Sequence, residues 1–426
     1  MLTFGGFLLL GGRLGDLYGN RKLFLLGIIL FTAASLACGL ANSQALLIGA
    51  RAIQGLGGAV VSAVALALIM NLFTEPAERA KAMGIFGFVM AGGGSIGVLL
   101  GGVLTGALNW HWIFLVNIPI GAAVYALCLV VLPDSRGQAT GRLDLAGAMT
   151  VTLSLMLAVY AIVNGNEAGW TSVQTLGMLA VAAVLFSLFL GIEARVRSPL
   201  MPLSLFRLRN VATANVVGVL WAAGMFAWFF ISALYMQLVL SYSPLQIGLA
   251  FLPSNLIMAA FSLGLSAKMV VRFGLRLPLV LGLLLAAMGL LLFGLSPVDG
   301  NFIAHILPGM LLMGLGCGMA FNPMLLAAMS DVNPSDSGLA SGIVNTAFMM
   351  GGALGLAVLA SLAAARTGYL AASGANSLIA LNGGYQLAFI VGAVFTGVAA
   401  VLGAAFLRVE IAGPAHDSLL IRSDEV

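Results

Sequence analysis

The sequence predicts an all-α membrane protein, and three observations lead to that prediction. Of the 426 residues, 61% are hydrophobic and 8% are charged, whereas about 25% of the residues of a soluble domain are charged. The apolar residues form long runs, and a bilayer-spanning helix needs about 20 of them. Only short polar links separate these runs. Such a chain has no room for a large soluble domain.

Thirteen apolar stretches qualify as membrane-spanning helices, because a helix satisfies its own backbone hydrogen bonds in lipid. In chain order they cover residues 1–14, which is short, 22–40, 45–73, 79–108, 112–132, 143–164, 174–196, 211–240, 246–270, 276–295, 302–329, 337–365 and 384–407. They predict a chain that crosses the membrane thirteen times.

The basic residues lie almost all on one side of these spans, and cytoplasmic loops carry an excess of Lys and Arg. Only Arg51, inside a span, and Arg366, near the other side, depart from this pattern. We therefore expect a multi-pass plasma membrane protein, of the bacterial inner membrane type, with a cytoplasmic C-terminus. Because the positive charge is explained by orientation, no nucleic acid partner is expected.

The chain contains an internal repeat. "YGNRKLFLLG" at 18–27 is echoed by "FGLRLPLVLG" at 273–282, and "MGIFGFVMAGGGSIGV" at 83–98 by "SGIVNTAFMMGGALGL" at 341–356. Four spans thus recur in order and in the same orientation, which is typical of transporters with parallel halves. The predicted domains are an N-terminal half of five helices at 1–132, two inserted helices with a connector at 133–210, a six-helix half at 211–412 and a cytoplasmic tail at 413–426.

A charged loop, "GRLGDLYGNRK" at 12–22, joins the first two spans. Its glycines allow a tight turn, and its Asp and Arg can pair with helix ends or with charges of the other half and so hold one conformation. The alternative is an ordinary basic loop. The candidate residues of this loop motif are Gly12, Asp16, Gly19, Arg21 and Lys22.

One arginine, Arg51 in "LIGARAIQGLGGA" at 47–59, lies within a span. A charge there costs about 2.5 to 3.5 kcal/mol on insertion scales, so such a residue usually faces a cavity. The alternative is that its side chain extends to the outer interface. The repeat places an apolar residue near Met310 at the equivalent position, so the architecture alone does not require the charge.

Two further motifs follow. "GGSIGVLLGG" at 93–102 carries Gly93, Gly97, Gly101 and Gly102, and small residues at this spacing also serve any close helix crossing. "NWHWIFLVNIPIG" at 109–121 places two tryptophans at a membrane interface.

Together these four motifs resemble the fourteen-span drug:proton antiporter branch of the major facilitator superfamily, over essentially the whole chain. The resemblance implies the major facilitator fold and proton-coupled efflux of lipophilic, often cationic drugs by alternating access. It gives Arg51 a part in proton coupling and makes the four glycines an antiporter motif, in which Val98 replaces the family's proline. His111 replaces a usual arginine in the fourth motif.

The resemblance also implies one more helix ahead of the first span, bearing a carboxylate that accepts the proton. The acidic residues here lie in loops or at the ends of spans. We therefore expect the 426-residue form to be inactive in coupled efflux, and a form with the additional helix to be active.

A possible substrate cavity is indicated by an aromatic stripe in the span at 211–240, because aromatic faces bind planar cations. More often such a stripe faces lipid or core. The candidates are Trp221, Met225, Trp228 and Phe229, with Phe348 and Met349 from the later repeat.

Other functions remain open at this point. The same fold also serves metabolite importers and facilitators, and an inactive truncated form is a further alternative. An enzyme is not expected, because the three His and three Cys residues are scattered without catalytic or metal-ligand spacing. We expect no cofactor and no metal, and a monomer whose partners are a small lipophilic or cationic substrate, protons and the lipid bilayer.

Overall fold

The computed structural model describes residues 2–73, 99–133, 144–196, 203–329 and 337–407, with isolated residues between these ranges. All regular structure in these ranges is helical. Ten of their helices are long and apolar enough to cross a membrane. The predicted all-α, multi-pass membrane protein is thereby confirmed.

The first group of helices forms one side of the molecule. These helices are α1 (Leu2–Tyr18), α2 (Asn20–Gly39), α3 (Gln44–Leu72), the short α5 (Trp112–Leu115) and α6 (Asn117–Val131). α3 packs on both α1 and α2, and α6 packs on α2. Most of the predicted span at 79–108 lies outside the described residues, but residues 99–107 are helical.

The two inserted spans form an antiparallel pair, α7 (Leu145–Ala168) and α8 (Val173–Glu193). Their starts are fixed by side-chain caps, since Asp144 accepts a hydrogen bond from the backbone N–H of Gly147 and Ser172 from that of Thr175. α7 also packs against α1 and against α14 (Ser337–Ala372). The inserted pair therefore contacts the first group of helices and also α14, which belongs to the second group described below.

The second group of helices encloses the largest core of the described residues. It contains α9 (Arg209–Leu234), α10 (Pro244–Ala260), α11 (Ser266–Phe273), α12 (Arg276–Gly294), α13 (Leu307–Ala327), α14 and α15 (Ser377–Phe406). Fully buried aromatic rings, among them Trp228, Phe293 and Phe389, fill this core. The burial of such large side chains is a dominant favourable term in folding.

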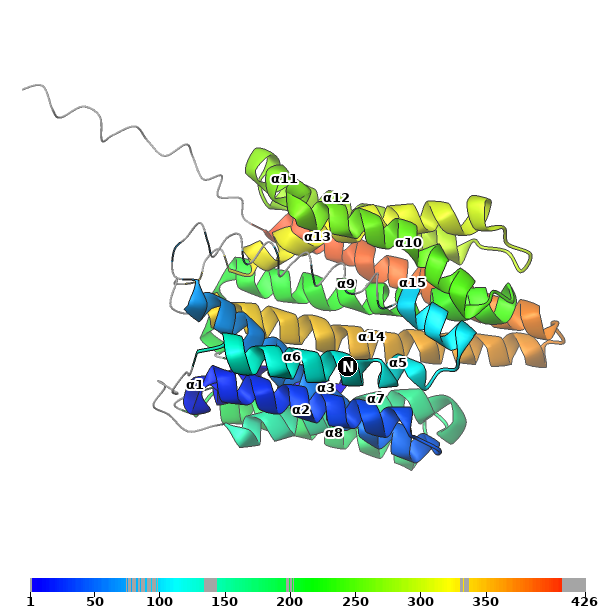
Figure 1. Cartoon of the computed structure of the whole chain (residues 1–426). Helices are drawn as coiled ribbons and strands as arrows, with labels where there is room; N and C mark the ends of the chain where they lie inside the picture. The colour runs from blue at the N-terminus through cyan, green and yellow to red at the C-terminus, as the bar shows by residue number, and fades with distance from the viewer. Residues whose placement is uncertain are drawn as a thin grey trace, which may run out of the picture.

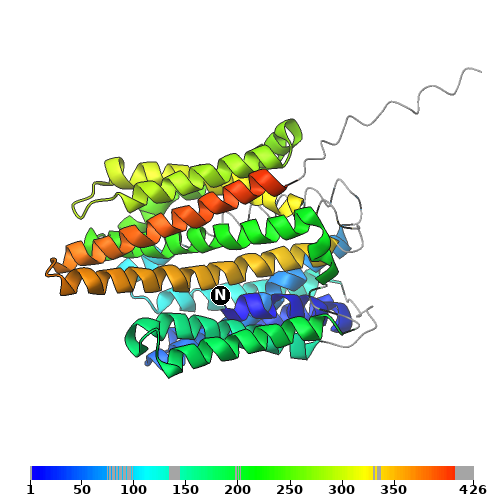
Figure 2. The ribbon, with the colours of Figure 1, turned by 180° about the vertical axis from the view of Figure 1, so that it is seen from behind.

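The long helix α14 is the member of the second group that faces the first group. It packs on α9 and α15 on one side and on α1 and α7 on the other. Figure 1 shows α10 to α13 on the far side of α9 and α14 from the first helices, and Figure 2 shows the same arrangement from behind. The domain boundaries at 132, 210 and 412 stay predictions.

Several helix boundaries differ from the predicted ones. α14 extends to Ala372 rather than 365, and α15 begins at Ser377 rather than 384, because Asn376 caps α15 through the backbone N–H of Leu378. The span predicted at 246–270 is interrupted between α10 and α11, where Gly264 has φ of 119°. That conformation is open to glycine and strained for other residues.

Candidate functional site

A cavity of about 680 Å³ lies among helices of both groups and α7. Its walls include Thr3 and Phe4 of α1, Phe31 of α2, Arg51 and Gln54 of α3, Met156 and Val159 of α7, and Met349, Ala353 and Leu356 of α14. The volume falls within the range of about 300 to 1,000 Å³ typical of small-molecule sites. Because the walls come from the first group of helices, from α7 and from α14, a movement of the first group relative to α14 would change the cavity.

Arg51 supplies the positive charge of this cavity. It lies seven residues after the start of α3, which is about 10 Å along the helix at 1.5 Å per residue. Its guanidinium lies 5.4 Å from the ring centroid of Phe114 in α5, within the range of a cation–π contact. The structure thus places Arg51 on a cavity wall, and the residue as a whole is exposed, so part of its side chain lies at the open edge of the cavity.

A chain of hydrogen bonds runs inward from Arg51. Its Nη1 donates to Oε1 of Gln54, whose Nε2 donates to Oγ of Ser35 over 2.6 Å. Ser35 Oγ in turn donates to the backbone oxygen of Phe31 over 2.8 Å. Gln54 is 3% exposed and Ser35 is fully buried. One edge of the guanidinium is therefore held by an anchored amide.

The side chains around Arg51 were not predicted from the sequence. Gln54 follows Arg51 by three residues, a spacing that puts two side chains on one helix face, so this contact had a detectable signal. Ser35 and Met156 come from α2 and α7, and no local pattern connects them with α3.

The loop motif connects α1 to α2 at Gly19. This glycine has φ of 97° and ψ of 128°, a region that is essentially restricted to glycine. Arg21 Nη2 donates to the backbone oxygen of Leu129 over 2.7 Å, which links the start of α2 to the last turns of α6. Lys22 is exposed, and the side chain of Asp16 lies outside the described residues.

We expect the Gly19→Ala variant to be less stable by about 1 to 3 kcal/mol, because an added Cβ strains this backbone conformation. The measurement is the thermal midpoint of the purified protein in detergent. Gly12→Ala is the control, since a Cβ there would meet Ala63 at an ordinary 3.8 Å. Equal midpoints for the two variants would contradict the strained-turn explanation.

The four glycines of the antiporter-type motif do not share one contact. A Cβ at Gly102 would lie 2.6 Å from the backbone oxygen of Pro244, at the start of α10. At Gly93, Gly97 and Gly101 a Cβ would meet no described atom within 4 Å. Gly102 therefore permits the close approach to α10, and the roles of the other three stay predictions.

The aromatic stripe of α9 lies mainly in the core. Trp221 and Trp228 are 0% exposed, and Phe348 of α14, 2% exposed, packs edge-on against the Trp221 ring. Phe229 and Met225 pack against the same core. Of the six predicted cavity residues, only Met349 is among the described residues that line the cavity. In this conformation the indole rings are not on the cavity wall.

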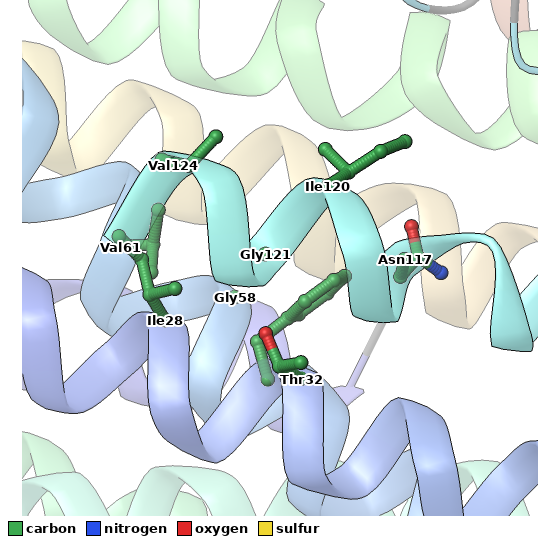
Figure 3. A pocket seen from close by; sticks show the side chains of 9 residues that line it. Ile28, Thr32, Gly58, Val61, Asn117, Ile120, Gly121 and Val124 are labelled. Carbon is green, nitrogen blue, oxygen red and sulfur yellow. The ribbon is translucent and has the colours of Figure 1, made fainter. Parts of the chain in front are cut away.

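A smaller cavity of about 200 Å³ lies between α2, α3 and α6. Figure 3 shows Ile28 and Thr32 on α2 facing Gly121 on α6, with Ile120 and Val124 on the same helix. Asn117 is the polar amide among these mostly aliphatic side chains. A space this small and apolar offers less to a drug-sized molecule than the cavity at Arg51.

Among the described residues, no group of three or more His, Cys, Asp or Glu side chains could hold a metal ion. Buried acidic residues do occur at one end of the inserted pair, where Asp144 is 5% and Glu193 is 3% exposed. Each accepts a backbone hydrogen bond, from Gly147 and Met201 respectively. Both carboxylates thus help to fix the ends of α7 and α8.

Comparison with known proteins agrees with this architecture. The family model described as Major Facilitator Superfamily matches residues 1–356. The chain is 38% identical over 399 residues to a puromycin resistance protein of Streptomyces alboniger, covering 92% of this chain and 79% of the relative. It is 38% identical over 405 residues to a cephamycin export protein of Amycolatopsis lactamdurans, covering 94% and 82%.

A solved structure supports the fold. An auto-inhibited peptide transporter of the POT family superposes with a TM-score of 0.63 at 18% identity, covering 97% of this chain and 89% of that one. The helix arrangement, the family match and relatives that act in antibiotic export and resistance agree with the resemblance read from the motifs. This chain belongs to the major facilitator superfamily.

Proposed function

We propose that the protein exports lipophilic small molecules in exchange for protons, by alternating access. The observation that carries the proposal is the cavity at Arg51, which is bounded by α1, α2 and α3, by the inserted helix α7 and by α14. Its walls are mainly apolar, as a lipophilic substrate requires. The relatives named for puromycin resistance and cephamycin export favour export over import.

Alternating access requires the helix groups to move against each other around the cavity. The contacts of α14 with α1 and α7 cross this boundary. One of them is polar, because Asn166 Nδ2 of α7 donates to the backbone oxygen of Ser361 over 2.8 Å. Such a contact can break and reform without the loss of a large buried apolar area.

Proton coupling is assigned to Arg51. Its charge favours the ionised form of any carboxylate that approaches it, so protonation and substrate movement would be linked at this cavity. The resemblance implies lipophilic, often cationic substrates, but the indole rings of the aromatic stripe of α9, which could bind a cation, are buried here. The proposal therefore covers lipophilic substrates and leaves their charge to be derived from the cavity itself.

The proposed location is the bacterial inner membrane, with the C-terminus in the cytoplasm, and the protein is proposed to act as a monomer. Basic residues such as Arg21, Lys22, Arg195 and Arg207 lie at or between helix ends, as the positive-inside rule requires for cytoplasmic loops.

The test is the accumulation of puromycin and ethidium in drug-sensitive bacteria that express the native protein. We expect lower accumulation than in cells with an empty vector, and restoration by a protonophore. Unchanged accumulation would contradict export. Lower accumulation that a protonophore does not affect would contradict proton coupling, and raised uptake would indicate an importer.

A further inference from the structure

The charge on the described walls of the cavity at Arg51 is positive. Among the described residues that line it, Arg51 is the charged one, and the others are polar without charge or apolar. A guanidinium stays protonated in proteins. Arg51 bonds to a neutral amide and stacks near a neutral ring, so neither neighbour cancels its charge.

Among the described residues, Arg51 forms no ion pair, and the acidic residues of α7 lie several turns along that helix from the α7 residues that line the cavity. Glu167 is exposed and follows Val159 by eight residues, about 12 Å along α7. Asp144 precedes Met156 by twelve residues at the other end of the same helix, about 18 Å away. The described part of the chain therefore leaves the charge of Arg51 without an acidic partner.

The guanidinium of Arg51 is held in an orientation that can bind an anion. It has five N–H donors in a planar fork that matches a carboxylate, and Gln54 accepts from Nη1. Among the described residues, no other acceptor bonds to Arg51. Because Ser35 and the Phe31 backbone hold Gln54 in place, binding an anion would require little further ordering of the arginine.

The rest of the cavity suits an apolar body. Phe4 and Phe31 supply rings, and Met156 of α7 and Met349 of α14 supply flexible thioether side chains. Methionine packs against ligands of varied shape. An apolar region of this kind next to a single fixed charge is complementary to an amphipathic molecule with one ionic end.

We propose that this cavity binds the carboxylate of an amphipathic small molecule through Arg51, with the apolar part of that molecule against Met156 and Met349. The cavity therefore selects anionic over cationic amphiphiles. To call the bound molecule a transported substrate rests on the proposed function, whereas the binding preference itself does not.

The test uses three probes that share a naphthalene body, namely 2-naphthylacetate, 2-naphthaleneethanol and 2-naphthylethylamine. Their affinities are measured by calorimetry on the purified native protein in neutral detergent. We expect the carboxylate to bind about tenfold more tightly than the amine, since a hydrogen bond to a charged group contributes on this scale. Equal affinities, or tighter binding of the amine, would overturn the proposal.

Four variants locate the preference. Arg51→Gln is expected to reduce it to within about twofold, and Arg51→Lys to retain part of it, because lysine keeps the charge and loses the fork. Arg366→Gln removes an exposed arginine of α14 that does not line the cavity, and it should leave the preference unchanged. Met156→Trp fills the cavity and should weaken all three probes. A preference that survives in Arg51→Gln would overturn the proposal.

An anionic lipid headgroup is the other source of a suitable anion. The titration is therefore repeated in nanodiscs of phosphatidylcholine with and without phosphatidylglycerol. We expect the preference for naphthylacetate in both. If phosphatidylglycerol abolishes naphthylacetate binding, the site belongs to lipid and the assignment to a soluble substrate is wrong. Export without anion preference would refute only this inference, and anion preference without export would refute only the proposed function.

Discussion

Replacing Arg51 by alanine is expected to reduce proton-driven export to the level of cells that lack the protein, while membrane insertion stays normal. The variant loses the positive charge that Arg51 gives to the cavity. It also loses the N–H group that donates a hydrogen bond to Oε1 of Gln54. Buried Gln54 then has an unsatisfied oxygen, which costs about 1 to 3 kcal/mol. Insertion should not suffer, because a charge within a span is itself unfavourable in lipid.

The measurement is efflux of preloaded ethidium from energised cells, with the amount of protein in the membrane determined in parallel. Arg366→Ala is the matched control, since it also removes an arginine, from an exposed position on α14. Normal efflux by the Arg51→Ala variant would refute the coupling role. A loss of efflux in both variants would show that the effect is not specific to the cavity.

The Gly355→Leu variant is expected to lose its folded structure. A Cβ at Gly355 would overlap the Cα and Cβ atoms of Ala223, where α14 crosses α9. Overpacking at a well-packed contact costs about 1 to 3 kcal/mol and occasionally more. Here the overlap includes backbone, so a side-chain rotation cannot relieve it, and separating α9 from α14 would open the main core.

Gly368→Leu provides the comparison on the same helix, because a Cβ there meets no described atom within 4 Å. The measurement is the fraction of solubilised protein that elutes as a single sharp peak in size-exclusion chromatography. We expect Gly355→Leu to aggregate and Gly368→Leu to behave as the unmodified protein. Similar profiles for the two variants would contradict the packing at this crossing.

The spans and the family were predictable from the sequence because hydrophobic length and loop motifs are local signals. Helix ends were less so. The extension of α14 to Ala372 includes the exposed residues Arg366 and Tyr369, which lower the local hydropathy although the backbone stays helical. Hydropathy reports the part of a helix that suits lipid, whereas the helix itself continues until a cap or a glycine ends it.

The candidate site was predictable only in part. Arg51 could be selected from the sequence because a charge within a membrane span is energetically costly, which indicates a functional role. The helical spacing of the aromatic stripe of α9 fits a cavity wall and a core-facing surface equally well. The structure places Trp221 and Trp228 in the core. Met156 gave no signal, because only the packing of α7 against α1 and α14 brings it to the cavity.

Proton flux through the purified protein tests the central claim most directly. Protein isolated from its own membrane is reconstituted into liposomes with an acidic interior, and the gradient is followed by quenching of an acridine dye. Adding a compound that the cells export should discharge the gradient, and the Arg51→Ala variant should not respond. If the gradient is unaffected while the compound crosses the membrane, the protein is not a proton-coupled exporter.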